Sequence, residues 1–203
     1  MQSEDRPRSP SVTPLLAVAG VLALAAALRL YAFTWGLPDD THMFSYHPDE
    51  FHSLRGALSL ATGDLNPHFF NYGSLYLYLV AIACMIGSPG IFASLSTAAI
   101  GGPEIPAALR AFTFDARVVT VILGIATVYV VYLLAARIWG HRAGLLAAGA
   151  LAVMPLHVVH SHYATVDVPG AFFVALALYF AVRLIDEPTG RNLAWASDRH
   201  GGN

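Results

Sequence analysis

Five apolar stretches, separated by short polar ones, dominate the hydrophobic pattern of the chain. Each is close to the roughly 20 residues that a helix needs to cross the hydrocarbon core of a membrane. Charged residues collect between the stretches, as expected for membrane-spanning helices and their loops. The stretches cover residues 12–34, 74–95, 116–138, 143–159 and 168–185. The pattern predicts an all-α membrane protein.

The distribution of arginine predicts which stretches cross. Arginine favours the cytoplasmic side of a membrane, so Arg6 and Arg8 place the N-terminus inside. If residues 74–95 do not cross, two later arginine clusters also fall inside. These clusters are Arg137 with Arg142 and Arg183 with Arg191. We therefore predict about four transmembrane helices, with external juxtamembrane helices beside them.

Residues 74–95 are also the weakest candidate for a span. Gly87-Ser-Pro-Gly90 interrupts them, which leaves the uninterrupted stretch Ser74–Ile86 too short to cross. We predict a juxtamembrane or re-entrant helix on the outer side. Such a segment must pack against other helices, because irregular backbone is not tolerated in contact with lipid.

The predicted layout has three parts. Residues 1–11 form a cytoplasmic N-terminal tail, residues 12–185 form the membrane-embedded module, and residues 186–203 form a polar C-terminal tail. The module contains an external loop at residues 36–115 and a short external turn at residues 160–167. The first apolar stretch exceeds the roughly 7–15 residues of a signal-peptide core, so we expect it to be retained.

Composition narrows the class of protein. Hydrophobic residues make up 56% of the chain and charged residues 12%, whereas a soluble domain has about 25% charged residues. The mean hydropathy is +0.57. A net charge of −2 argues against a nucleic-acid partner. The single cysteine, Cys84, excludes an intramolecular disulfide, so the external loop must be held by packing.

The first candidate chemistry follows the first span, in Tyr46-His-Pro-Asp-Glu-Phe-His52. Pro48 is expected to start an amphipathic helix there. The adjacent carboxylates of Asp49 and Glu50 can act as a general base or hold a cation. The structural alternative is that Asp49 caps the helix and Glu50 interacts with its dipole.

A second group of candidates lies between the third and fourth predicted spans. Ionisable groups at a membrane boundary are costly to desolvate, so they are functional candidates by default. Asp167 is predicted to face the same outer side as Asp49, with His160 and His162 near the opening. The alternative is a loop with interfacial histidines, and His157 is placed where a packed role is plausible.

Arg117 is the third candidate, at the outer start of the second predicted span. Its guanidinium can bind a phosphate of the outer leaflet through paired donors. The alternative is that it extends along the helix toward lipid headgroups. Arg29, near the end of the first span, offers the same choice, and there we favour the extended conformation.

Several segments follow one another in a recognisable order. They are Asp49-Glu50, Ala116-Arg-Val-Val-Thr-Val-Ile-Leu-Gly124, Arg137-Ile-Trp-Gly-His-Arg-Ala-Gly144 and Met154-Pro-Leu-His-Val-Val-His-Ser-His-Tyr-Ala-Thr-Val-Asp-Val-Pro169. This set resembles the GT-C membrane glycosyltransferases, and most closely the protein O-mannosyltransferases and aminoarabinose transferases. The resemblance extends from the first span to about Leu184.

The resemblance implies transfer of a sugar from a polyprenyl-phosphate donor to a protein or lipid acceptor on the extracytoplasmic side. Asp49, with Glu50 beside it, corresponds to the family's first-loop acid, Arg117 to its span-start arginine and Asp167 to its second-loop acid. His162 is added as a substrate-binding candidate. We expect a multi-pass protein of the plasma membrane. Family members have many more spans, so we expect this chain to be the N-terminal part of such a protein and inactive alone.

The sequence does not identify a cofactor. A divalent metal ion is one option, because His160, His162 and Asp167 offer ligand atoms. The alternative function is a metal-binding or transport subunit that uses these residues together with His47 and His52. A transport path, however, would place ionisable groups at mid-span depth. A noncatalytic membrane subunit is a third alternative.

Overall fold

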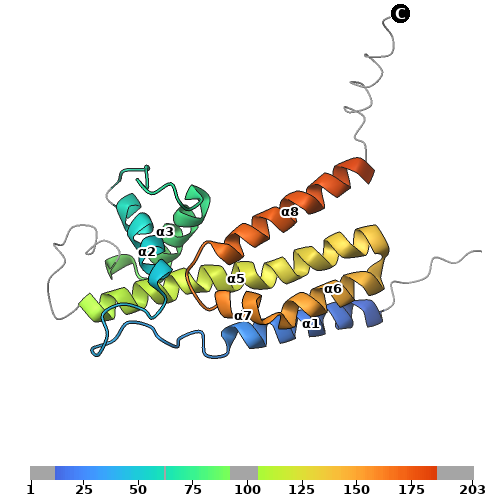
Figure 1. Cartoon of the computed structure of the whole chain (residues 1–203), viewed down its shortest axis with the longest axis horizontal. Coiled ribbons are helices and arrows are strands. Elements are labelled where there is room, and N and C mark those ends of the chain that lie inside the picture. The colour runs from blue at the N-terminus through green and yellow to red at the C-terminus, as the bar shows by residue number, and fades with distance from the viewer. Residues whose placement is uncertain (1–11, 62, 92–104, 187–203) are drawn as a thin grey trace, which may run out of the picture.

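The computed structural model describes residues 12–61, 63–91 and 105–186, and its regular elements there are helices (Figure 1). The helices are α1 (Val12–Leu30), α2 (Pro48–Ala61), α3 (Ser74–Gly87), α5 (Ile105–Trp139), α6 (His141–Val153), α7 (Pro155–His160) and α8 (Asp167–Asp186). Within these ranges, β-pairing is limited to one isolated bridge between Asp39 and His42. The predicted N-terminal tail, residues 1–11, and the predicted C-terminal tail, residues 186–203, lie outside the described residues except for Asp186, which ends α8.

α5 is the central helix and packs against α1, α2, α3, α6 and α8. Its 35 residues make it about 50 Å long, well beyond the roughly 30 Å of a hydrocarbon core. The predicted span at residues 116–138 is therefore only its C-terminal part. Residues 105–115, predicted as loop, continue the same helix, because Pro106 lies in the first turn, where proline is tolerated, and no proline follows.

Small residues allow α1, α5 and α6 to lie side by side, while α8 packs on α5 and diverges from it (Figure 1). The buried contact between α1, α5 and α6 consists of Ala25, Val128, Ala148 and Ala152. At Gly144, a Cβ atom would lie 2.8 Å from the Tyr132 carbonyl oxygen. The close approach of α5 and α6 therefore requires glycine at this position.

α2 and α3 pack against the N-terminal part of α5 (Figure 1). The core of this region is apolar and comprises Leu54, Ala57, Tyr76, Leu77, Val80, Ala81, Cys84, Phe112, Ala116 and Ala164. α3 has 14 residues, fewer than the roughly 20 of a span, and ends at the glycine expected to interrupt it. Its place outside the membrane stays a prediction.

The third predicted crossing, residues 143–159, is divided into two helices. α6 ends at Val153 and α7 begins at Pro155, because proline lacks the N–H that would continue the hydrogen-bond ladder. Among the described helices, α5 and α8 are each long and apolar enough to cross a membrane, and Pro14–Leu30, Ser74–Gly87 and His141–Val153 are shorter apolar helices. Together with the composition, these helices confirm the predicted class, an all-α membrane protein.

Candidate functional site

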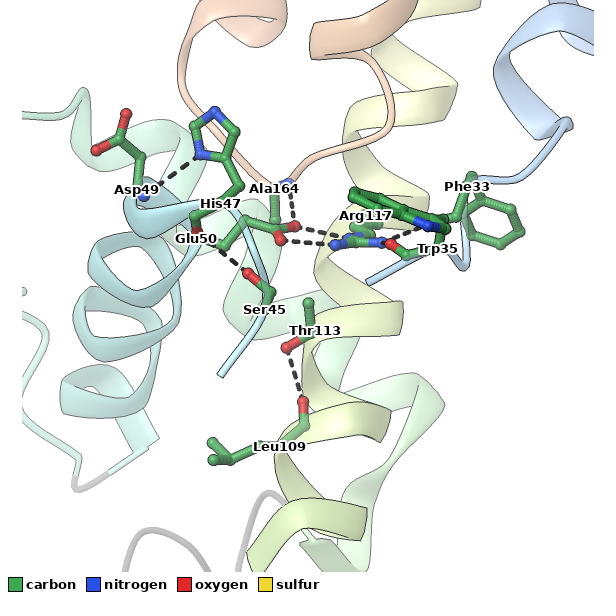
Figure 2. Close-up of polar contacts among 10 residues, drawn as sticks. All are labelled: Phe33, Trp35, Ser45, His47, Asp49, Glu50, Leu109, Thr113, Arg117 and Ala164. Carbon is green, nitrogen blue, oxygen red and sulfur yellow. Dashed lines mark hydrogen bonds and ion pairs between the residues drawn. The ribbon is translucent and has the colours of Figure 1, made fainter. Parts of the chain in front are cut away.

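Segments far apart in the sequence meet at one junction (Figure 2). They are the segment after α1, the start of α2, the N-terminal half of α5 and the loop between α7 and α8. Pro48 begins α2 and places Asp49 and Glu50 in its first turn. The loop between α7 and α8 ends at Asp167, the first residue of α8. The segment that carries Asp49 and Glu50 and the loop that leads to Asp167 therefore lie at the same end of the helical bundle.

A buried ion pair between Glu50 and Arg117 forms the centre of this junction. Arg117 Nε donates to Glu50 Oε1 and Arg117 Nη2 donates to Glu50 Oε2, both at 2.7 Å. Both side chains are 0% exposed. The contact is the planar, two-point pairing that guanidinium and carboxylate groups favour.

The same two side chains also hold the surrounding backbone. Arg117 Nη1 donates to the carbonyl oxygens of Phe33 and Trp35, each at 2.7 Å (Figure 2). The Ala164 N–H donates to Glu50 Oε1 at 2.7 Å, and Arg117 Cζ lies 5.3 Å from the centre of the Tyr163 ring. The pair therefore connects α2 and α5 to the segment that follows α1 and to the loop between α7 and α8, and we call it the Glu50–Arg117 clamp.

The clamp revises the predicted roles of Glu50 and Arg117. Arg117 uses four of its five N–H donors within the protein, so little capacity remains for a donor phosphate. Glu50 is equally occupied and has no exposed oxygen to accept a substrate proton. The sequence alone did not predict this pairing, although an arginine within an apolar helical stretch needs a partner once it is buried.

Asp49, in contrast, is exposed, and its carboxylate points away from the clamp (Figure 2). Its backbone N–H donates to His47 Nδ1 at 3.3 Å. His47 thus supplies the hydrogen bond at the start of α2 that the structural alternative assigned to Asp49. The Asp49 carboxylate makes no hydrogen bond within the described residues, so it is available to a substrate.

Two histidines and a tyrosine connect the surroundings of Asp49 to those of Asp167. The His47 ring lies 4.7 Å from the Tyr163 ring and 6.3 Å from the His160 ring, measured between centroids. His160 Nδ1 lies 3.3 Å from Asp167 Oδ2, and the Asp167 side chain is 57% exposed. Through these rings, the structure brings the start of α2, which carries Asp49, close to Asp167.

His162 and His157 face α1 instead. His162 Nε2 lies 3.1 Å from the Leu28 carbonyl oxygen in the last turn of α1, so its predicted contact with substrate stays a prediction. His157 Nδ1 lies 2.8 Å from Arg29 Nη2, which agrees with the packed role considered for it. Arg29 is 0% exposed, so the expectation that it extends toward headgroups is wrong. The carbonyl oxygens of α1 and α6 hold it inside the bundle.

The histidines and acids do not form an evident metal site. Within residues 12–61, 63–91 and 105–186, no group of three or more His, Cys, Asp or Glu side chains could hold a metal ion. His162 is turned away from the pair formed by His160 and Asp167. The three ligands suggested by the sequence therefore do not fit a shared ion in this geometry.

Comparison with known families gives one match. Residues 106–197 match the family model described as dolichyl-phosphate-mannose-protein mannosyltransferase. This part of the chain is similar to membrane mannosyltransferases. The match supports the predicted GT-C mannosyltransferase-like fold and, more broadly, a membrane glycosyltransferase. No curated protein and no solved structure matches the chain.

The mannosyltransferase match covers almost all of α5 together with α6, α7 and α8. It includes Arg117, His162 and Asp167 but not Asp49 and Glu50. The structure links the two parts, because the matched region supplies Arg117 and Ala164 to the carboxylate of Glu50. The first-loop acids are thus physically joined to the mannosyltransferase-like region.

Proposed function

We propose that this protein transfers a sugar from a polyprenyl-phosphate donor to an acceptor hydroxyl on the extracytoplasmic side of the membrane. The principal support is the exposed carboxylate of Asp49, at the start of α2, which the His47 and His160 rings connect to Asp167. The similarity of residues 106–197 to mannosyltransferases supports the reaction class. Mannose is the sugar favoured by that similarity, and the acceptor is a protein or a lipid.

In the proposed reaction, Asp49 is the general base. The acceptor O–H gives its proton to the Asp49 carboxylate as the acceptor oxygen forms a bond to the anomeric carbon. The bond from that carbon to the phosphate oxygen breaks at the same time, with inversion, and the polyprenyl phosphate departs with the electron pair. The leaving group is already an anion, so no acid is needed to protonate it.

The Glu50–Arg117 clamp positions this base in our proposal. Glu50 follows Asp49 directly, and its carboxylate is fixed by Arg117 and by the Ala164 N–H. Fixing Glu50 also fixes the backbone of the first turn of α2, and with it the position of the Asp49 Cα atom. A positioned base is more effective than a mobile one, because less orientational freedom is lost on reaching the transition state.

The proposal is tested by comparing membranes that contain the Asp49→Asn variant with membranes that contain the wild-type protein. Asp49→Asn keeps the shape of the side chain but removes the proton acceptor. Transfer of radiolabelled mannose from polyprenyl-phosphate mannose to a serine- and threonine-rich peptide should fall by roughly 10²-fold or more. Asp39→Asn, an exposed acid of the same predicted loop, is the control and should retain activity. Unchanged transfer by Asp49→Asn would remove Asp49 from the reaction.

The orientation is proposed from the distribution of arginine and has its own test. In a Cys84→Ala background, Trp139→Cys should resist an impermeant thiol reagent added outside intact cells, because the connection between α5 and α6 is predicted to be cytoplasmic. Asp64→Cys, in the predicted external loop, should react. External labelling at position 139 would contradict the four-span layout.

A further inference from the structure

A row of aromatic side chains extends from the face of α2 that carries Asp49. His52 lies one helical turn after Asp49, and its ring stacks on Phe69 with centroids 5.6 Å apart and planes 4° from parallel. The next ring, Tyr72, lies nearly perpendicular to Phe69, with the two centroids 5.0 Å apart. Phe69 and Tyr72 also pack against the core between α2, α3 and α5. The row is therefore fixed in place on one side.

Tyr72 differs from the nearby Tyr76 and Tyr78 in the hydrogen bonding of its hydroxyl. The Tyr76 hydroxyl lies 3.4 Å from Thr120 Oγ1, and the Tyr78 hydroxyl donates to the Leu65 carbonyl oxygen at 2.5 Å. The Tyr72 hydroxyl makes no hydrogen bond in the part of the chain that the structure describes. Its ring is held by packing while its polar end has no protein partner.

The aromatic row leads from His52, one turn from Asp49, to Tyr72, whose hydroxyl also experiences the charges of two acids. Burial raises the pKa of the Tyr72 hydroxyl above its ordinary value, and the negative charges of Asp49 and Asp167 raise it further. Tyr72 thus stays protonated at neutral pH and can donate a hydrogen bond. It is close enough to both carboxylates to experience their charge.

The surroundings of Tyr72 suit a neutral hydroxyl more than an anion. The carboxylates of Asp49 and Asp167 act on Tyr72, whereas the guanidinium of Arg117 is already paired inside the clamp. A phosphate directly beside Tyr72 would be repelled by both carboxylates, so this position fits the acceptor rather than the phosphate of the donor. A hydroxyl can donate to one of them while it accepts from a phenol.

We propose that Tyr72 is a substrate-binding residue whose hydroxyl donates to the acceptor oxygen and holds it beside Asp49. This assignment rests on the proposed transferase function and adds the acceptor subsite to it. Phe69 and His52 keep the phenol in place, so the hydrogen bond requires little further ordering. The ligand class is a hydroxyl-bearing acceptor.

Kinetics of Tyr72→Phe test the assignment, because this change removes one oxygen and keeps the packing. In the membrane assay with the serine- and threonine-rich peptide, the KM for the peptide should rise about 10-fold, the effect of one lost hydrogen bond. The KM for polyprenyl-phosphate mannose should not change. Tyr46→Phe, an exposed tyrosine that packs on Trp35, is the matched control and should behave as wild type. An unchanged peptide KM in Tyr72→Phe would overturn the proposal.

A spectroscopic measurement separates this proposal from the proposed function. In the full chain labelled with 3-fluorotyrosine, the ¹⁹F resonance that disappears in Tyr72→Phe identifies Tyr72. That resonance should shift in Asp49→Asn and in Asp167→Asn but not in Asp39→Asn. Such shifts without any sugar transfer by wild-type membranes would reject the transferase function and retain the Tyr72 environment. The absence of shifts would reject the acceptor subsite even if the protein transfers sugar.

Discussion

Arg117 and Arg29 are both fully buried, but their positive charges are compensated in different ways. Arg117 is paired with a carboxylate through two hydrogen bonds of 2.7 Å. Arg29 has no carboxylate partner among the described residues. It donates to the carbonyl oxygens of Ala25 and Ala152 at 3.1 Å and lies 2.8 Å from His157 Nδ1.

The difference lies in how the charge is compensated. At Arg117, a full negative charge balances the guanidinium, so removal of either partner leaves an isolated charge in a dry site. At Arg29, partial charges at the C-terminal ends of α1 and α6 provide the compensation. Arg29 Nε has no hydrogen-bond partner in the described part of the chain, so the solvation of this cation is incomplete. Replacement by an uncharged side chain should therefore change the free energy of unfolding more at Arg117 than at Arg29, although both are equally buried.

The largest effect is expected at the clamp. Arg117→Met keeps an apolar side chain of similar length but leaves Glu50 buried without its counter-charge. The free energy of unfolding in detergent should fall by about 3–5 kcal/mol. Chemical denaturation followed by circular dichroism measures the change. A double variant, Arg117→Met with Glu50→Met, should recover at least half of the loss, because no isolated charge remains. No recovery would mean that the backbone bonds, and not the charge, dominate.

A smaller loss is expected at Gly124, the position on α5 that faces the Arg29 site. A Cβ atom there would lie 2.6 Å from Ser161 Oγ and 3.3 Å from Arg29 Nε. Gly124→Ala should therefore lower the free energy of unfolding by about 1–3 kcal/mol through overpacking. The same measurement on Gly149→Ala provides the control, because nothing lies within 4 Å of a Cβ atom at that position in α6. Gly149→Ala should be neutral or stabilising by up to about 1 kcal/mol.

The smallest effect is expected for Arg29→Met. The carbonyl oxygens of Leu151 and Ala152 lose a donor, but removal of an incompletely solvated cation offsets that cost. The free energy of unfolding should change by no more than about 1 kcal/mol in either direction, measured alongside Arg117→Met. Equal losses in the two variants would show that burial alone, without the type of compensation, sets the sensitivity.

The sequence predicted which loops carry the candidate residues, but it did not predict which of these residues pair with one another. Asp49 and Glu50 are adjacent and equally acidic, so a pattern of residue types gives no reason to separate them. The first turn of α2 turns one side chain outward and the other into the protein. Arg117 and Arg29 were likewise expected to reach a phosphate or the lipid headgroups, because both lie near the ends of predicted spans.

The sequence by itself determined the class of the protein, since apolar stretches of membrane length and the placement of Gly and Pro depend only on local order. It also indicated that acids from two separate loops belong to one end of the helices. Only the tertiary structure decided which carboxylate is free. That outcome depends on Arg117, 67 positions away from Glu50, and on the Ala164 N–H, 114 positions away. Such pairing is set by how α2, α5 and the loop after α7 pack together, because hydrogen bonds and desolvation act between neighbours in space.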